Sequence, residues 1–287
     1  MAYPDFVIIG AMKCGTSSLH AQLAAQDGFF MSEPKEPNFF SDDDVYAKGT
    51  DWYQGLFAGG EDALKGESST HYAKRPTYPA CFERLSATLP RARFIYVMRD
   101  PLDRLVSHYI HEWTMGNVKG TLSEEIETAR ELIDYGRYAY QLEPYLAHYG
   151  RERILPVFLE RMNADPQSEL ARIGAFLGAG RPLTWREDIS AQNVSRDRLR
   201  KPPLSGLLID NPVAQVLRRT FVPQGVRDRI KSRLQMRERP SLSEGDLKRL
   251  KPVFDEDLNK LGAMLGVDLN CDVYRETVTR RPLDWAA

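Results

Sequence analysis

Short apolar runs alternate with helix-period patterns along the first two thirds of the chain. Three runs have the length and composition of buried strands: residues 5–10 (DFVIIG), 93–98 (RFIYVM) and 154–159 (ILPVFL). Pro156 cannot donate a ladder hydrogen bond, which places the third run near an edge of its sheet. Apolar residues at helical spacing predict helices from Thr16 to about Ala25, from Pro101, and at about 121–134, 138–149 and 166–178. This alternation predicts an α/β fold with a central parallel sheet flanked by helices.

The pattern changes after Trp185. Residues 190–203 are polar and basic without periodicity and predict a loop, whereas residues 204–221 predict a helix. Ser241 and Glu244 have the spacing of a capping box. They open a further helix, whose apolar stripe is Leu247, Leu250, Phe254, Leu258, Leu261 and Leu265. Because no Gly/Ser-rich linker precedes this part, we expect one domain over 1–287, with an α/β core at 1–185 and a basic loop and C-terminal helical cap at 186–287.

Composition places the chain among globular proteins. It has 287 residues, 42% hydrophobic and 28% charged, with a net charge of −1, which excludes general disorder, collagen and coiled coil and argues against a nucleic-acid partner. No run reaches the length of a membrane span, and the N-terminus lacks the pattern of a secretory signal. The cysteines Cys14, Cys81 and Cys271 form neither a disulfide framework nor a metal-ligand pattern. We therefore expect a cytoplasmic protein without a metal site.

The near-zero net charge hides two unlike segments. Residues 26–71 carry a net charge of −7 (10 acidic, 3 basic), and residues 196–251 carry +9 (15 basic, 6 acidic). We therefore expect an anion site to use residues of the second segment rather than of the first.

A glycine-containing turn joins the first predicted strand to the first predicted helix. It reads Gly10-Ala11-Met12-Lys13-Cys14-Gly15-Thr16-Ser17-Ser18. Converging backbone N–H groups and the helix dipole favour an anion here, Lys13 adds a full charge, and three hydroxyls follow. A Walker A loop has lysine directly after its second glycine, where Thr16 stands in this chain. The alternative is an ordinary turn in which Thr or Ser caps the helix.

A second anion motif follows the second predicted strand. Arg99 stands at the carboxyl edge of that strand, where ligands bind in open α/β sheets, and Ser107 follows about two helical turns later. A planar guanidinium and a hydroxyl suit a phosphate group. The alternative is a local ion pair between Arg99 and Asp100, with Ser107 as a surface serine.

Together these motifs resemble the sulfotransferases that use 3′-phosphoadenosine 5′-phosphosulfate (PAPS). Gly10 to Leu19 is similar to their 5′-phosphosulfate loop, and Arg99-Asp100-Pro101 with Ser107 is similar to their 3′-phosphate motif. Lys35-Glu36-Pro37-Asn38-Phe39-Phe40 and Gly66-Glu67-Ser68-Ser69-Thr70-His71-Tyr72 look most like the glycan (heparan sulfate) branch, in a bacterial-type member.

The resemblance implies a P-loop-like three-layer fold and transfer of a sulfuryl group from PAPS to a hydroxyl or amine, with 3′-phosphoadenosine 5′-phosphate (PAP) as product and no metal required. It assigns the nucleotide to two motifs and to a later basic loop, through Lys13, Cys14, Gly15, Thr16, Ser17, Ser18, Arg99, Ser107, Arg198, Arg200 and Lys201. The alternative for the basic loop is a solvated charged loop. Lys13 meets the charge that develops on the leaving group. The rival functions are a P-loop kinase or NTPase and a non-enzymatic polyanion-binding protein.

The resemblance also implies a general base for the acceptor, at Glu36. The alternative for Glu36 is a solvated carboxylate paired with Lys35, and His71 and Glu67 are the reserve candidates. Ser68 stands where the glycan branch often has lysine, which removes one expected positive charge. If the acidic segment 26–71 lines the acceptor cleft it repels polyanions, so we expect a neutral or cationic small molecule or sugar as acceptor.

Overall fold

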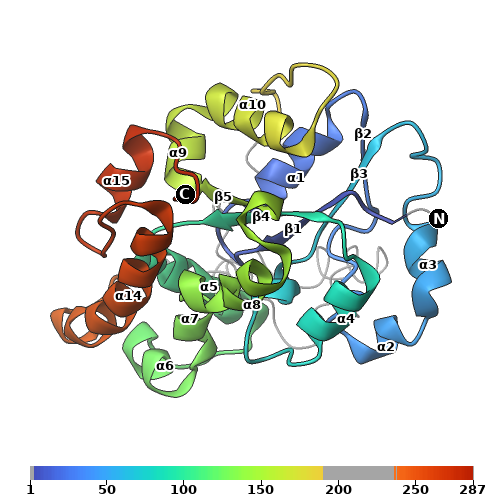
Figure 1. Cartoon of the computed structure of the whole chain (residues 1–287). Coiled ribbons are helices and arrows are strands. Elements are labelled where there is room, and N and C mark those ends of the chain that lie inside the picture. The colour runs from blue at the N-terminus through green and yellow to red at the C-terminus, as the bar shows by residue number, and fades with distance from the viewer. Residues whose placement is uncertain (1–2, 190–235, 237, 287) are drawn as a thin grey trace, which may run out of the picture.

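Figure 1 shows the computed structural model, which describes residues 3–189, 236 and 238–286. Its five-stranded sheet has the order β2-β3-β1-β4-β5, and every neighbouring pair is parallel. The strands are β1 Phe6–Gly10, β2 Phe29–Met31, β3 Leu64–Ser68, β4 Arg93–Met98 and β5 Ile154–Phe158. The three predicted strands are confirmed as β1, β4 and β5, and β5, which holds Pro156, forms one edge of the sheet.

Helices cover both faces of the sheet, which confirms the predicted three-layer α/β fold. They are α1 Thr16–Ala24, α2 Asp43–Tyr46, α3 Gly49–Gly55, α4 Cys81–Thr88, α5 Pro101–Met115, α6 Leu122–Thr128, α7 Glu131–Asp134, α8 Tyr138–Tyr149, α9 Leu159–Ala164, α10 Pro166–Leu177, α14 Glu244–Leu265 and α15 Tyr274–Arg280, with 3₁₀ turns η1 Thr70–Ala73 and η2 Arg151–Arg153. Figure 1 shows α1 and α10 over one face and α4 and α8 over the other. The pattern predicted at 121–134 forms two helices, α6 and α7.

Strand β3 lies inside the sheet although its sequence, LKGES, is polar. Gly66 lies against the ring of Phe6, and a Cβ atom added there would come within 2.2 Å of it. Glu67 and Ser68 are fully buried. Close packing on glycine and buried polar groups thus replace the apolar run that identifies the other central strands.

The helix starts follow local capping chemistry. Asp100 caps α5 by accepting a hydrogen bond from the Asp103 N–H at 3.0 Å, and Pro101 opens its first turn, as predicted. The predicted capping box of the C-terminal helix is shifted by two residues: Ser243 and Asp246 form it, not Ser241 and Glu244. The Asp246 carboxylate reaches the Ser243 N–H at 3.0 Å, which fixes the register.

The apolar stripe of α14 packs against the core as predicted. Leu250, Phe254, Leu258, Leu261 and Leu265 are buried, and Leu247 is half-buried. The Asp257 carboxylate accepts hydrogen bonds from the first N–H groups of α8, at 2.9 and 3.0 Å, and so ties α14 to the core. The loop predicted at 190–203 and the helix predicted at 204–221 lie outside the described residues, and the division at residue 185 stays a prediction.

Among the helices of the described residues, none combines the length and the apolar character that crossing a membrane requires.

Candidate active site

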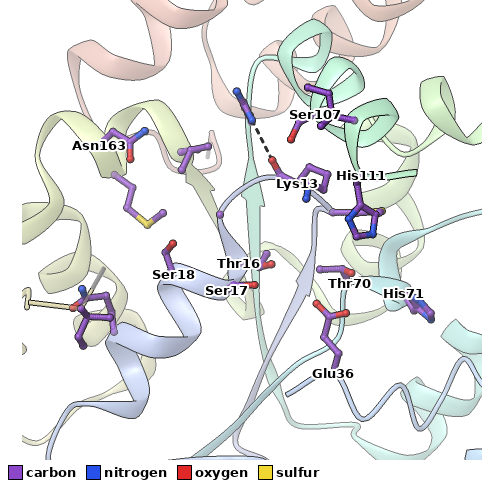
Figure 2. A pocket seen from close by; sticks show the side chains of 18 of the residues that line it. Lys13, Thr16, Ser17, Ser18, Glu36, Thr70, His71, Ser107, His111 and Asn163 are labelled. Carbon is purple, nitrogen blue, oxygen red and sulfur yellow. Dashed lines mark hydrogen bonds between the residues drawn. The ribbon is translucent and has the colours of Figure 1, made fainter. Parts of the chain in front are cut away.

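A cavity of about 850 Å³ opens where β1 and β4 end and α1 and α5 begin (Figure 2). Both predicted anion motifs, the predicted base and one reserve base line it together: Lys13, Gly15, Thr16, Ser17, Ser18, Glu36, His71, Arg99 and Ser107. Because β1 and β4 are neighbouring parallel strands, two motifs more than 80 residues apart in sequence meet at one sheet edge.

The loop after β1 leaves the start of α1 open. Gly15 is the N-cap residue, with φ of 88°, a left-handed conformation that favours glycine, and a Cβ atom there would lie 2.8 Å from Leu159. No side-chain hydrogen bond caps this helix, so the ordinary capped turn considered from the sequence is not what forms. The Ser18 N–H donates to the Gly15 carbonyl at 3.1 Å, whereas the N–H groups of Thr16 and Ser17 have no acceptor among the described residues and are available to an anion.

Lys13 and Arg99 both line the cavity and are joined by a hydrogen bond. The Arg99 guanidinium donates a 3.5 Å hydrogen bond to the Lys13 carbonyl, which Figure 2 draws as a dashed line. It also forms a 3.4 Å ion pair with the Asp103 carboxylate. Burial and the nearby Arg99 charge lower the pKa of Lys13. The local pair with Asp100 considered from the sequence does not form, because Asp100 instead caps α5 and pairs with Arg275 at 3.3 Å.

The side chain of Cys14 belongs to the core and not to the cavity lining. The Cys14 side chain is fully buried and lies 3.7 Å from the Tyr138 hydroxyl. Burial raises the pKa of its thiol to about 12. The cavity lining includes Lys13 and Gly15 but not Cys14. Arg198, Arg200 and Lys201 lie outside the described residues.

Glu36 lines the cavity in a left-handed conformation. Its φ is 59°, and among the described residues other than glycine only Lys13 and Asn38 share a positive φ. The following Phe39 and Phe40 are fully buried and hold this backbone in place. The carboxylate is also 2.6 Å from the Lys35 ammonium, so the ion pair and the cavity position predicted as alternatives occur together.

His71 lies on the same side of Lys13 as Glu36 in Figure 2. Its ring stacks on Tyr78 with centroids 4.5 Å apart, and Nδ1 is buried without a hydrogen-bond partner among the described residues. Burial, and the nearby Lys74 charge, lower the pKa of His71 to about 4, so the imidazole is neutral at pH 7.

Glu67, the other reserve base, does not line the cavity. It is fully buried on β3, and it interacts electrostatically with the hydroxyls of Tyr53 and Tyr72. Burial raises the pKa of its carboxyl to about 8, so this group is largely protonated at pH 7.

This raised pKa gives Glu67 a measurable effect on stability. Its carboxyl titrates near pH 4.5 in the unfolded chain and near pH 8 in the fold, so the folded protein binds more protons between these values. This group therefore makes the folded protein more stable at lower pH. Between pH 8 and pH 4.5, the free energy of unfolding rises by up to about 1.4 kcal/mol for each pH unit of acidification. In urea unfolding, the difference between wild type and Glu67→Gln should follow this slope, whereas parallel pH profiles would contradict it.

Some lining residues carry no sequence motif. Lys74, Asn163, Trp185 and Arg239 line the cavity because the fold brings separate segments together. His111 had a signal, since it lies one helical turn after Ser107 on α5.

The charge of the lining differs from the sequence expectation. Of the ten acidic residues in segment 26–71, only Glu36 lines the cavity. The charged residues of the described lining are Lys13, Lys74, Arg99, Arg239, Glu36 and Glu187. Cations thus outnumber acids, and the premise that acidic residues repel an anionic acceptor does not hold for this part of the chain.

Comparisons with known proteins agree on one family. The family profile described as "Sulfotransferase domain" matches residues 3–262. Heparan sulfate glucosamine 3-O-sulfotransferase 3B1 of Mus musculus is 32% identical over 215 residues, which are 71% of this chain and 53% of that protein. Bifunctional heparan sulfate N-deacetylase/N-sulfotransferase 2 of Homo sapiens is 29% identical over 196 residues, 61% of this chain and 22% of that protein. The chain thus spans about half, or less, of the length of these relatives.

A solved structure shows the same fold. The crystal structure of a sulfotransferase from Alicyclobacillus acidocaldarius matches with a TM-score of 0.65 and 24% identity, and covers 98% of this chain and 100% of that one. The resemblance inferred from the two anion motifs is confirmed by the family match. The chain belongs to the sulfotransferase domain family.

Proposed function

We propose that this chain transfers the sulfuryl group of PAPS to a hydroxyl or amine of a small-molecule or carbohydrate acceptor. The observation that carries the proposal is the single cavity in which the Lys13 loop, the Arg99–Ser107 motif and Glu36 meet. The family match supports the reaction class. For the acceptor, the proposal specifies only the nucleophilic group, a hydroxyl or an amine.

The two motifs divide the donor between them. The open N-terminus of α1, with Thr16, Ser17 and Ser18, binds the 5′-phosphosulfate, because unpaired N–H groups and hydroxyls suit a divided negative charge. Arg99 and Ser107 bind the 3′-phosphate through a charge-assisted contact and a hydroxyl. Anchoring both ends of the donor fixes the position of its sulfur relative to Lys13 and Glu36.

The transfer step requires a base and a cation on opposite sides of the sulfur. Glu36 takes the proton of the acceptor as its oxygen or nitrogen bonds to sulfur. The bond between sulfur and the bridging oxygen of the 5′-phosphate breaks, and Lys13 stabilises the charge left on that oxygen. PAP leaves with that charge, and the sulfated acceptor leaves without its proton.

Calorimetry with PAP tests the donor site. We expect wild type to bind PAP and Arg99→Ala to bind it about 100-fold more weakly, because the variant loses charge-assisted hydrogen bonds to a phosphate. The control is Arg91→Ala. Arg91 is exposed and precedes the first residue of β4, at the end of the strand opposite Arg99, so this variant should bind PAP as wild type does.

Other outcomes would contradict the proposal. Absence of PAP binding by wild type rules out this donor. Tight binding of Mg-ATP in its place favours a kinase or NTPase. Salt-sensitive binding of a polyanion that survives Lys13→Ala favours a non-enzymatic polyanion-binding protein.

A further inference from the structure

The cavity holds a second lysine that has no acidic partner. Lys74 follows η1, is only 8% exposed, and lines the cavity together with Glu36 and His71. No carboxylate of the described residues forms an ion pair with it. Its ammonium lies over the Tyr135 ring, 5.5 Å from the ring centroid.

A buried ammonium without a counter-ion is unfavourable, because it loses hydration that no carboxylate replaces. Burial lowers the pKa of Lys74 to about 8, while Glu36 and Glu112 act in the opposite direction from longer range. Lys35 is different, since its ammonium lies 2.6 Å from the Glu36 carboxylate. Of these two lysines, Lys74 gains more from an anion that a ligand brings into the cavity.

Lys74 follows a different strand from the two that carry the donor motifs. The donor motifs follow β1 and β4, whereas Lys74 follows β3, on the other side of β1 in the order β2-β3-β1-β4-β5. Glu36 follows β2, so it comes from the same half of the sheet. In Figure 2, Ser18 lies on one side of the view and Thr70 and His71 on the other, with Thr16 and Ser17 between them.

We propose that Lys74 binds an anionic group of the acceptor, a carboxylate or a sulfate, while the accepting hydroxyl or amine faces Glu36. The inference rests on the proposed function and makes that acceptor an anionic molecule. It replaces the sequence expectation of a neutral or cationic acceptor, which depended on acidic residues that do not line the cavity.

The test fills the donor site first and then asks whether an anion subsite remains. The protein is saturated with PAP, and methyl sulfate is titrated by ligand-observed NMR, with dimethyl sulfone as a neutral probe of similar size. We expect the Kd of methyl sulfate to be about tenfold higher in Lys74→Met than in wild type, because one charge-assisted contact is lost. Lys74→Arg, which keeps the charge, should retain binding.

The matched control is Lys48→Met. Lys48 also lies over an aromatic ring, 4.5 Å from the Trp52 centroid, but it is exposed and does not line the cavity. This variant should bind methyl sulfate as wild type does, and dimethyl sulfone should not distinguish the proteins.

Three results would overturn the inference: no binding of methyl sulfate by the wild-type PAP complex, equal binding by wild type and Lys74→Met, or a loss of PAP affinity in Lys74→Met. The last would assign Lys74 to the donor. If Lys74→Met does not fold, loss of methyl sulfate binding in a folded Lys74→Arg would likewise count against it. Failure of wild type to bind PAP is a separate result, which contradicts the proposed function itself.

Discussion

Lys13→Met should lower kcat for sulfuryl transfer by about a thousandfold, because the variant loses the cation that faces the charge developing on the leaving phosphate. Several structural features hold Lys13 at that position. Its backbone has φ of 69°, its carbonyl accepts the Arg99 hydrogen bond, and the side chain lines the cavity beside the open start of α1. Preorganised charge of this kind has little reorganisation to undergo during the reaction.

The measurement is the release of PAP from PAPS with the acceptor that supports the fastest turnover in a panel of phenols, amines and sugars, with and without a carboxylate or sulfate group. PAP affinity should fall much less than kcat, because Arg99, Ser107 and the α1 amides, the other groups proposed to bind the nucleotide, are unchanged. Lys48→Met serves as the control for loss of a lysine outside the cavity. Equal losses in PAP affinity and in turnover would assign Lys13 to ground-state binding instead.

The sequence predicted the parts of this site that depend on local patterns. β1, β4 and β5 are apolar runs, and ligand motifs at the ends of β1 and β4 meet because parallel neighbours place their carboxyl ends at one edge. The position of one helix cap was nevertheless ambiguous. Ser241 and Ser243 each have an acidic residue three positions later, so spacing alone did not decide which pair caps α14.

The other features of the site depend on which side chains the fold buries and on where the chain turns back toward the cavity. Glu67 and Ser68 are adjacent on β3, and both are fully buried outside the cavity lining, which the sequence did not show. Lys74 is in the lining because η1 turns the chain back after β3. Charge summed along 26–71 was a poor guide to the cavity, since adjacent residues there, such as Asp42, Asp43 and Asp44, belong to other surfaces.

Glu36→Gln should lower kcat by about 10²- to 10⁴-fold and leave PAP affinity unchanged, because an amide cannot take the acceptor proton. The variant keeps the size and shape of the side chain, and Glu36 belongs to neither of the two motifs proposed to bind the nucleotide. Its effect on the Lys35 ion pair is separable, since Lys35→Met removes the pair and keeps the carboxylate. A base role predicts a much smaller loss of turnover in Lys35→Met.

The matched control is Glu33→Gln, an exposed glutamate three residues earlier in the same segment, which should have wild-type turnover. Turnover that survives in Glu36→Gln would make Glu36 a structural partner of Lys35 and move the base to His71. His71→Gln would then carry the loss. With a pKa of about 4, His71 remains neutral over the working range, so turnover governed by it should not fall between about pH 8 and pH 6.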